Sequence, residues 1–240
     1  MKKHFYISFL ILNAILFNPL STSAQQTNNT EQRYTTFDKL VGSENTSLYQ
    51  GRLYIEKYRT INNRQQFFKS IEFIIGDVWY KGQSYFNQLL KYDVYEDELL
   101  LKLEESENIL TLSKKDIDSF SLGKDQFVNL KLNTLPLESF GYHKVLFQDY
   151  KFTLYAKYHK NIWQLKDDNY AYYEFTDAKT KYVLLYDEDY YILNSKKDII
   201  SAFPNHKKEI KKLYNNAKKR HKKDSDAIMT TVVRQLESII

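Results

Sequence analysis

The chain has 240 residues, carries a formal net charge of +5 and contains no cysteine. The absence of cysteine excludes disulfide bonds, thiolate metal sites, cysteine nucleophiles and a lipid anchor attached to cysteine. Aromatic residues make up 16% of the chain, mostly as 21 Tyr and 15 Phe, which indicates either a strand-rich aromatic core or an aromatic binding face.

Residues 1–24 have the pattern of a secretory signal peptide. Two lysines precede an apolar run over residues 5–17, and small residues follow it up to Ala24. The apolar run is shorter than the ~20 residues that a membrane-spanning helix needs. The sequence therefore predicts cleavage after Ala24, export to the periplasm, the cell surface or the medium, and no transmembrane span in the mature chain.

The next segments predict a flexible lead-in and then a β-rich body. Residues 25–46 are polar with few apolar anchors, which is typical of a mobile segment. From there to residue 194, turn signals recur every ~8–12 residues, the spacing of antiparallel folds. Strands are predicted over 48–59, 67–75, 78–80, 85–94, 99–103, 109–112, 117–122, 127–132, 140–147 and 152–158, and a hairpin over 181–193 that turns at residues 187–189. The pattern over 163–174 leaves its secondary structure open.

After Asn194 the apolar period changes from 2 to 3.6 residues, which predicts helices. Helix starts are predicted at Ser195, at Asn205 and at Asp224 or Ser225. The two longer helices carry apolar stripes that should pack against strands. The predicted fold is therefore a β-rich α+β fold: a curved antiparallel sheet or sandwich-like body over 47–194, with two or three C-terminal helices over 195–240 packed on it.

The C-terminal region is strongly basic. Residues 196–223 hold eleven Lys or Arg and two acids, a net charge of +9. This segment is a plain solvated helix face, a contact for the phosphates of anionic lipid or lipopolysaccharide, or a contact for an envelope protein. Nucleic acid is not an expected partner of an exported protein. The candidate anion-binding residues are Lys207, Lys208, Lys211, Lys212, Lys218, Lys219, Arg220, Lys222 and Lys223.

No catalytic, metal or cofactor site is predicted. The four histidines after the signal peptide are not at metal-ligand spacing, and no nucleophile elbow, phosphate-binding loop or dinucleotide fingerprint is present. Acids gather at two predicted turns, residues 93–98 and 187–189. Solvated turns are the expected role, with a metal site or a catalytic pair as alternatives. The Tyr92-Asp93 pair predicts a packed ring and a carboxylate that caps the turn.

The tract Gly76–Leu99, which reads GDVWYKGQSYFNQLLKYDVYEDEL, carries a resemblance to a known family. It is similar to exported proteins of Bacteroidota-type Gram-negative bacteria to which no activity is assigned. Shorter similar pieces lie at 48–51, 67–70 and 141–146, and the lysine-rich helix also matches. The resemblance implies a β-rich envelope or secreted protein and implies no activity.

These observations favour an exported, envelope-associated protein that is a non-enzymatic binding or structural component. The alternative is a glycan-binding module or glycan-active enzyme that uses an aromatic-lined face, with Trp79 and Trp163 as candidate aromatic residues. A cleft lined by exposed aromatic side chains, with two carboxylates ~5–10 Å apart, is what the alternative requires.

Overall fold

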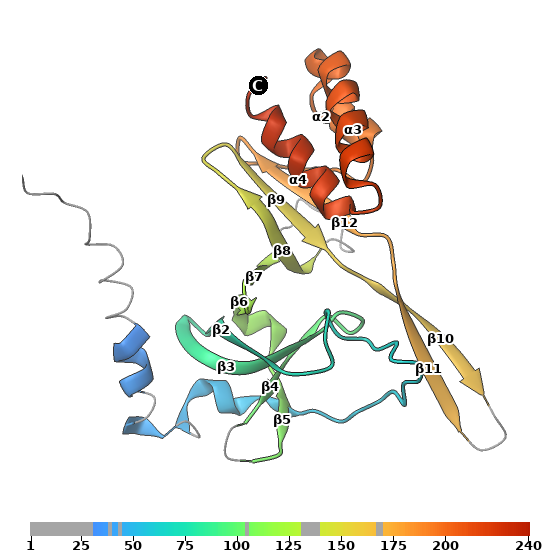
Figure 1. The fold of residues 1–240 in the computed structure, drawn as a ribbon. Coiled ribbons are helices and arrows are strands. Elements are labelled where there is room, and N and C mark those ends of the chain that lie inside the picture. The colour runs from blue at the N-terminus through green and yellow to red at the C-terminus, as the bar shows by residue number, and fades with distance from the viewer. Residues whose placement is uncertain (1–30, 38–39, 43–44, 104–105, 131–139, 167–169) are drawn as a thin grey trace, which may run out of the picture.

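The computed structural model describes residues 31–37, 40–42, 45–103, 106–130, 140–166 and 170–240. The predicted signal peptide lies outside the described residues, and so does part of the predicted lead-in. The described chain forms one long, curved antiparallel sheet, a two-stranded ribbon that projects from it, and a layer of C-terminal helices over one end of the sheet (Figure 1). This architecture confirms the predicted β-rich α+β fold with C-terminal helices.

The strands and helices follow one another along the chain in short steps. The strands are β1 (Arg52–Leu53), β2 (Ile74–Tyr80), β3 (Gln83–Asp93), β4 (Glu98–Lys102), β5 (Ile109–Thr111), β6 (Ile117–Leu122), β7 (Asp125–Leu130), β8 (Gly141–Gln148), β9 (Phe152–Lys157), β10 (Lys160–Lys166), β11 (Ala171–Asp177), β12 (Lys181–Tyr186) and β13 (Asp189–Ile192). The helices are α2 (Lys196–Ala202), α3 (Lys207–His221) and α4 (Ser225–Leu236), with short 3₁₀ turns η2 (Ser47–Gln50), η3 (Lys114–Asp116) and η5 (Pro204–His206).

The large sheet runs in the order β1-β5-β4-β3-β2-β6-β7-β8-β9-β12-β13, and β10 pairs with β11 alone. The hairpins were largely predictable because their turns carry clear signals. The β2–β3 turn is Lys81-Gly82, with both residues at positive φ, which is the geometry of the common two-residue hairpin turn. The β12–β13 turn at Asp187-Glu188 has the same geometry, so this predicted hairpin is confirmed.

Three groups of buried side chains hold the sheet. The first lies inside the curved half made by β2–β4, β6 and β7, where aromatic rings pack together: Phe120 stacks on Phe127 at 4.8 Å, and Tyr142 meets Phe120 edge-on at 5.0 Å. The second lies between the helices and one face of β9 and β12. The third, smaller group covers the opposite face of these strands. The aromatic composition therefore serves mainly as core.

The helical layer folds back on the sheet as the apolar stripes predicted. Ser195 caps α2 and Asp224 caps α4, each with a side-chain oxygen that accepts from a backbone N–H three residues on. The predicted cap at Asn205 is wrong. Pro204 begins a 3₁₀ turn, and the N-cap of α3 is His206, one residue after the predicted position. Proline favours the first position of a helical turn, which places Asn205 inside the turn.

Two predicted strands are wrong over most of their length. Residues 48–59 contain η2 and only two strand residues, because their neighbour β5 has three residues and offers little edge to pair with. Residues 67–73 are irregular, and β2 begins only at Ile74. Lys69 there has φ 58°, which breaks an extended strand. Both apolar runs still supply core residues, Leu48 and Phe68.

The sequence left the secondary structure of residues 163–174 open and did not predict a helix within residues 25–46. Residues 163–174 belong to the ribbon of β10 and β11, which extends away from the sheet at the lower right of Figure 1. Residues 31–37, within the predicted lead-in, are helical, and the Asn87 amide donates to Glu31 over 3.0 Å. The mobility of residues 25–46 stays a prediction.

Candidate functional site

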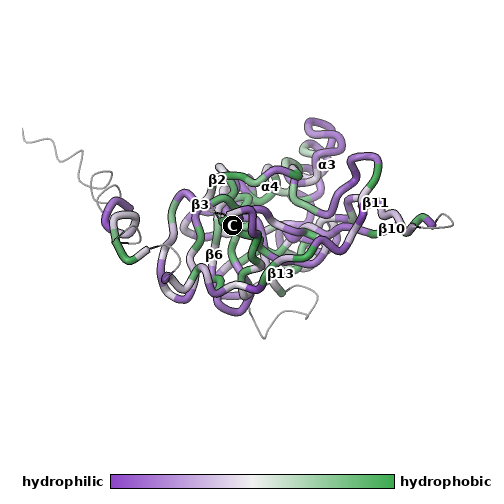
Figure 2. Tube along the Cα trace, turned by 90° about the horizontal axis from the view of Figure 1, so that it is seen from below, coloured by the Kyte–Doolittle hydropathy of each residue, from purple (hydrophilic) through white to green (hydrophobic). Residues whose placement is uncertain are grey.

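The exposed face of α3 is the strongest concentration of charge in the described structure. All nine candidate cations are exposed, while Ile210 and Ala217 on the opposite face of the helix are buried. Among the described residues, none of the nine forms an ion pair with a carboxylate. The trace of α3 is accordingly mostly hydrophilic and lies at the outside of the molecule (Figure 2). The structure therefore brings the predicted set together on one solvent-facing surface, which we call the cationic face of α3.

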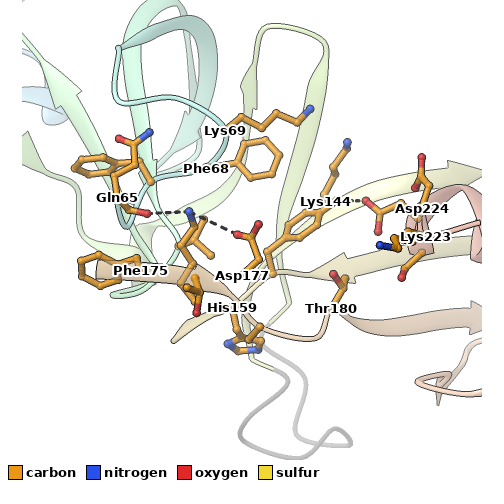
Figure 3. Close-up of a pocket in the computed structure, with 18 of the residues that line it drawn as sticks. Gln65, Phe68, Lys69, Lys144, His159, Phe175, Asp177, Thr180, Lys223 and Asp224 are labelled. Atoms are coloured by element: carbon orange, nitrogen blue, oxygen red, sulfur yellow. Dashed lines mark hydrogen bonds and ion pairs between the residues drawn. The ribbon is translucent and has the colours of Figure 1, made fainter. Parts of the chain in front are cut away.

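The C-terminal end of α3 leads into a cleft of about 1120 Å³ (Figure 3). Three parts of the chain form most of its lining: the irregular segment 63–69, the base of the β10–β11 ribbon, and the first turns of α4. Lys223, the last residue of the cationic face, is part of the wall. Sequence reasoning missed the cleft because the first and last of these parts, residues 63–69 and 223–231, are at least 154 residues apart and no local pattern joins them.

Most charged side chains of the cleft are already paired. The Asp125 carboxylate accepts from Lys69 and Lys144, each over 2.7 Å. The Lys160 ammonium donates to the Gln65 carbonyl over 2.8 Å and lies 3.6 Å from the Asp177 carboxylate. The wall therefore presents charges as neighbouring opposite pairs and not as a field of one sign.

Asp226 ties α4 to the sheet at the same cleft. Its carboxylate accepts from the Tyr158 hydroxyl and, over 2.8 Å, from the Tyr182 hydroxyl. Burial and the adjacent Asp226 carboxylate raise the pKa values of both tyrosines, so both hydroxyls stay protonated and act as donors. Tyr158 also packs on Phe68 with 5.3 Å between ring centroids, which closes the floor of the cleft.

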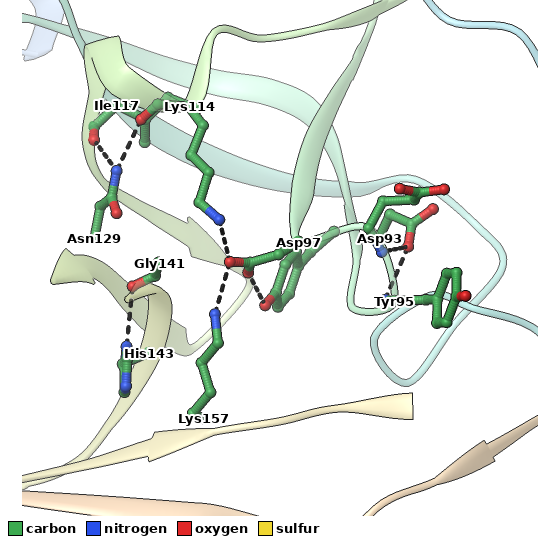
Figure 4. Close-up of polar contacts among 11 residues, drawn as sticks. Asp93, Tyr95, Asp97, Lys114, Ile117, Asn129, Gly141, His143 and Lys157 are labelled. Carbon is green, nitrogen blue, oxygen red and sulfur yellow. Dashed lines mark hydrogen bonds and ion pairs between the residues drawn. The ribbon is translucent and has the colours of Figure 1, made fainter. Parts of the chain in front are cut away.

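A second polar cluster lies inside the curved sheet and centres on Asp97 (Figure 4). The Asp97 carboxylate accepts from the Tyr92 hydroxyl and the Lys157 ammonium, each over 2.6 Å, and from the Lys114 ammonium. Burial alone raises the pKa of Asp97, but the two ammonium groups outweigh it and hold that pKa below its ordinary value. The Lys157 side chain is only 4% exposed, so the cluster is closed to solvent on that side.

Gly141 leaves the space that Asp97 fills. A Cβ atom at residue 141 would stand 2.0 Å from Oδ2 of Asp97 and 2.7 Å from the ammonium groups of Lys114 and Lys157. Gly141 also has φ +101°, a conformation that side chains rarely adopt. The cluster therefore joins the β3–β4 turn to β8 and β9, and we assign it a structural role.

Two titratable groups near this cluster are buried. Burial raises the pKa of Asp93 to about 7, although its carboxylate accepts from the backbone N–H groups of Tyr95 and Glu96. Burial also lowers the pKa of His143 to about 4, and its Nδ1 lies 2.9 Å from the Gly141 carbonyl oxygen. The predicted packed Tyr92 ring and capping Asp93 carboxylate are confirmed. The expectation that the whole 93–98 turn is solvated is wrong, because the turn folds onto β9.

The metal-site alternative for the acidic turns finds no support among the described residues. Within the described ranges, no group of three or more His, Asp or Glu residues is placed to hold a metal ion. The two candidate aromatic residues lie outside the cleft: Trp79 is in β2, and Trp163 is in β10 with 63% of its surface exposed. The aromatic residues of the cleft are mostly buried, including Phe67, Phe68 and Phe175.

No helix in the described part of the chain combines the length and the apolar character that crossing a bilayer requires. Comparison of the sequence with protein-family models and curated proteins, and of the chain with solved structures, finds no match.

Proposed function

We propose that this is an exported, non-enzymatic binding protein of the cell envelope, and that the cationic face of α3 is its contact with a phosphate-bearing surface such as anionic lipid or lipopolysaccharide. One observation carries the proposal: nine exposed cations on and just after one helix, with no ion-pair partner among the described carboxylates. The resemblance of residues 76–99 to exported proteins supports the proposed location in the cell envelope.

The charge on α3 works against the stability of the helix, which argues for a role outside folding. Lys207 and Lys208 lie in the first turn, where the helix dipole disfavours cations. Each also faces a like charge four residues on, at Lys211 and Lys212, and such pairs are destabilising. Only the cations of the last turn suit the dipole. The first turn also holds one acid, Glu209, which offsets only one of the two lysines there.

The cationic face of α3 suits a surface contact without insertion. The apolar residues of the helix, including Ile210 and Ala217, face the protein and are buried, so they are not available to enter a bilayer. The exposed face carries no Trp or Phe. Binding must then be mainly electrostatic, so it should weaken as salt shortens the screening length to below ~10 Å.

Vesicle co-sedimentation tests the proposal. The protein is mixed with vesicles of phosphatidylglycerol or of phosphatidylcholine at low salt, and we expect it to pellet with the first only. The triple variant Lys208→Glu, Lys211→Glu, Lys212→Glu should bind at least about a hundredfold more weakly, since a cation near an anionic surface contributes about 1 kcal/mol.

A matched variant separates a local contact from net charge. Lys124→Glu, Lys166→Glu and Lys179→Glu make the same change in charge at exposed positions outside α3. This control should bind nearly as well as the unmodified protein. Equal losses in the two triple variants, or no binding to phosphatidylglycerol at low salt, would refute the role of α3.

A further inference from the structure

The geometry points to the cleft as a binding site for an oligosaccharide. The inference goes beyond the proposed contact with phosphate, because it concerns a different surface with a different chemistry. The cleft adjoins the cationic face of α3 at Lys223, so one envelope glycan could occupy both. Its volume of about 1120 Å³ exceeds the ~300–1,000 Å³ that small-molecule sites occupy, which favours a ligand of several rings.

The charges of the wall favour a neutral ligand rich in hydroxyl groups. Five basic side chains line the cleft, and five carboxylates either line it with them or pair with them. The basic residues are Arg64, Lys69, Lys144, Lys160 and Lys223, and the carboxylates are Asp125, Glu174, Asp177, Asp224 and Asp226. A free phosphate requires a surplus of positive charge, which this wall does not offer.

Paired charges keep hydrogen-bonding capacity that a sugar can use. An ammonium group bound to one carboxylate still has two N–H donors, and a carboxylate has about four acceptor positions. The Asp226 carboxylate, which accepts from two tyrosines, retains such positions toward the cleft. The wall also carries hydroxyl groups, on Thr176 and Thr230. A sugar hydroxyl both donates and accepts, so it matches this mixture where a purely cationic or purely anionic ligand does not.

The floor of the cleft offers one aromatic side chain, Tyr158. It is half-buried and packs on Phe68, which is itself buried together with Phe67 and Val94 beneath the surface of the cleft. A sugar ring has an apolar C–H face and a polar edge, so it can place the first on this floor and the second on the rim. The polar wall and the Tyr158 ring together match one chemical class of ligand.

Saturation-transfer NMR on the full protein tests the inference. Two probes distinguish the source of the glycan: the lipid-free polysaccharide released from lipopolysaccharide, and soluble glycan strands of peptidoglycan. We expect transfer to at least one probe. Thr230→Trp, which fills the cleft from α4, should reduce that transfer at least fivefold. Gln235→Trp adds the same side chain to an exposed position of α4 outside the cleft and should leave the transfer unchanged.

A second blocking variant covers the case in which Thr230→Trp does not fold. Thr176→Trp fills the cleft from β11 on the opposite wall and should give the same loss. No transfer to either probe, or equal transfer in the folded blocking variants and in the unmodified protein, overturns the inference. The triple α3 variant should retain oligosaccharide binding and Thr230→Trp should retain vesicle binding, so failure of one idea leaves the other measurable.

Discussion

At the scale of single residues, Asp97 is the centre of the polar cluster inside the curved sheet. Its carboxylate compensates the ammonium group of Lys157, which is almost fully buried, and that of Lys114. Asp97→Asn removes the negative charge, so neither Lys114 nor Lys157 has a carboxylate partner at this position. Loss of one partner of a buried ion pair costs about 3–5 kcal/mol, and we expect a loss of that size in the free energy of unfolding measured by urea denaturation at pH 7.

Asp125→Asn is the matched control for Asp97→Asn. Asp125 also binds two lysines, but the side chain of Lys69 is 55% exposed and that of Lys144 is 18% exposed, so water replaces much of the lost interaction. The expected loss is smaller than that of Asp97→Asn, because both lysines that bind Asp125 are more exposed than Lys157. Equal losses in the two variants would show that burial of Lys157 does not matter.

Asp93 should give the protein an unusual dependence of stability on pH. In the unfolded chain the carboxyl group ionises near pH 3.9, whereas in the folded protein burial raises its pKa to about 7. Between these values the folded state holds a proton that the unfolded state has released. The stabilisation from Asp93 is therefore complete below the unfolded pKa and is lost as the pH rises through about 7.

The variant Asp93→Asn isolates this contribution. His143 acts in the opposite direction over part of the same range, because its pKa is lowered to about 4, but both proteins contain it. From pH 5 to pH 8, we expect the free energy of unfolding of the unmodified protein to fall relative to that of Asp93→Asn by on the order of 1–3 kcal/mol. Urea midpoints at the two pH values measure it. A constant difference between the two proteins would mean that Asp93 ionises normally.

At the scale of elements, α3 should show a trade between stability and binding. Lys208→Glu replaces a cation in the first turn by an acid that suits the dipole and faces Lys212 four residues on. The free energy of unfolding should rise by about 0.5–1 kcal/mol, while binding to phosphatidylglycerol vesicles falls. Thermal unfolding and co-sedimentation of the same sample measure both. A variant that loses stability and binding together would point to misfolding instead of a functional charge.

Elements with a local signal could be predicted, and elements defined by distant partners could not. The turn at Asp187-Glu188 and the cap at Ser195 depend on neighbouring residues and were predicted, and the cap at Asp224 was one of two predicted alternatives. The strand predicted over 48–59 failed because its length depends on the edge that β5 offers, and the paired residues of β1 and β5 are 57 to 59 positions apart in the sequence. In the segments 48–59 and 67–73, apolar content correctly predicted that some side chains are buried, but it wrongly predicted strands.

At the scale of the whole molecule, the two candidate sites differ in how far the sequence reveals them. The cationic face of α3 is continuous in sequence: seven of its nine cations lie within one helix, and Lys222 and Lys223 follow it directly. The cleft and the Asp97 cluster form only when the sheet curves and the ribbon and α4 meet at the segment 63–69. No single-sequence pattern contains that curvature, since it follows from β-bulges and from long-range packing.

The most direct test of the central claim is lysine footprinting of the full protein on vesicles. The protein is acetylated briefly with and without phosphatidylglycerol vesicles at low salt, and mass spectrometry measures the modification of each lysine. We expect the lysines from Lys207 to Lys223 to be protected severalfold by the vesicles, while Lys124, Lys166 and Lys179 react equally in both samples. Protection spread evenly over the surface, or confined to lysines outside α3, would contradict the account.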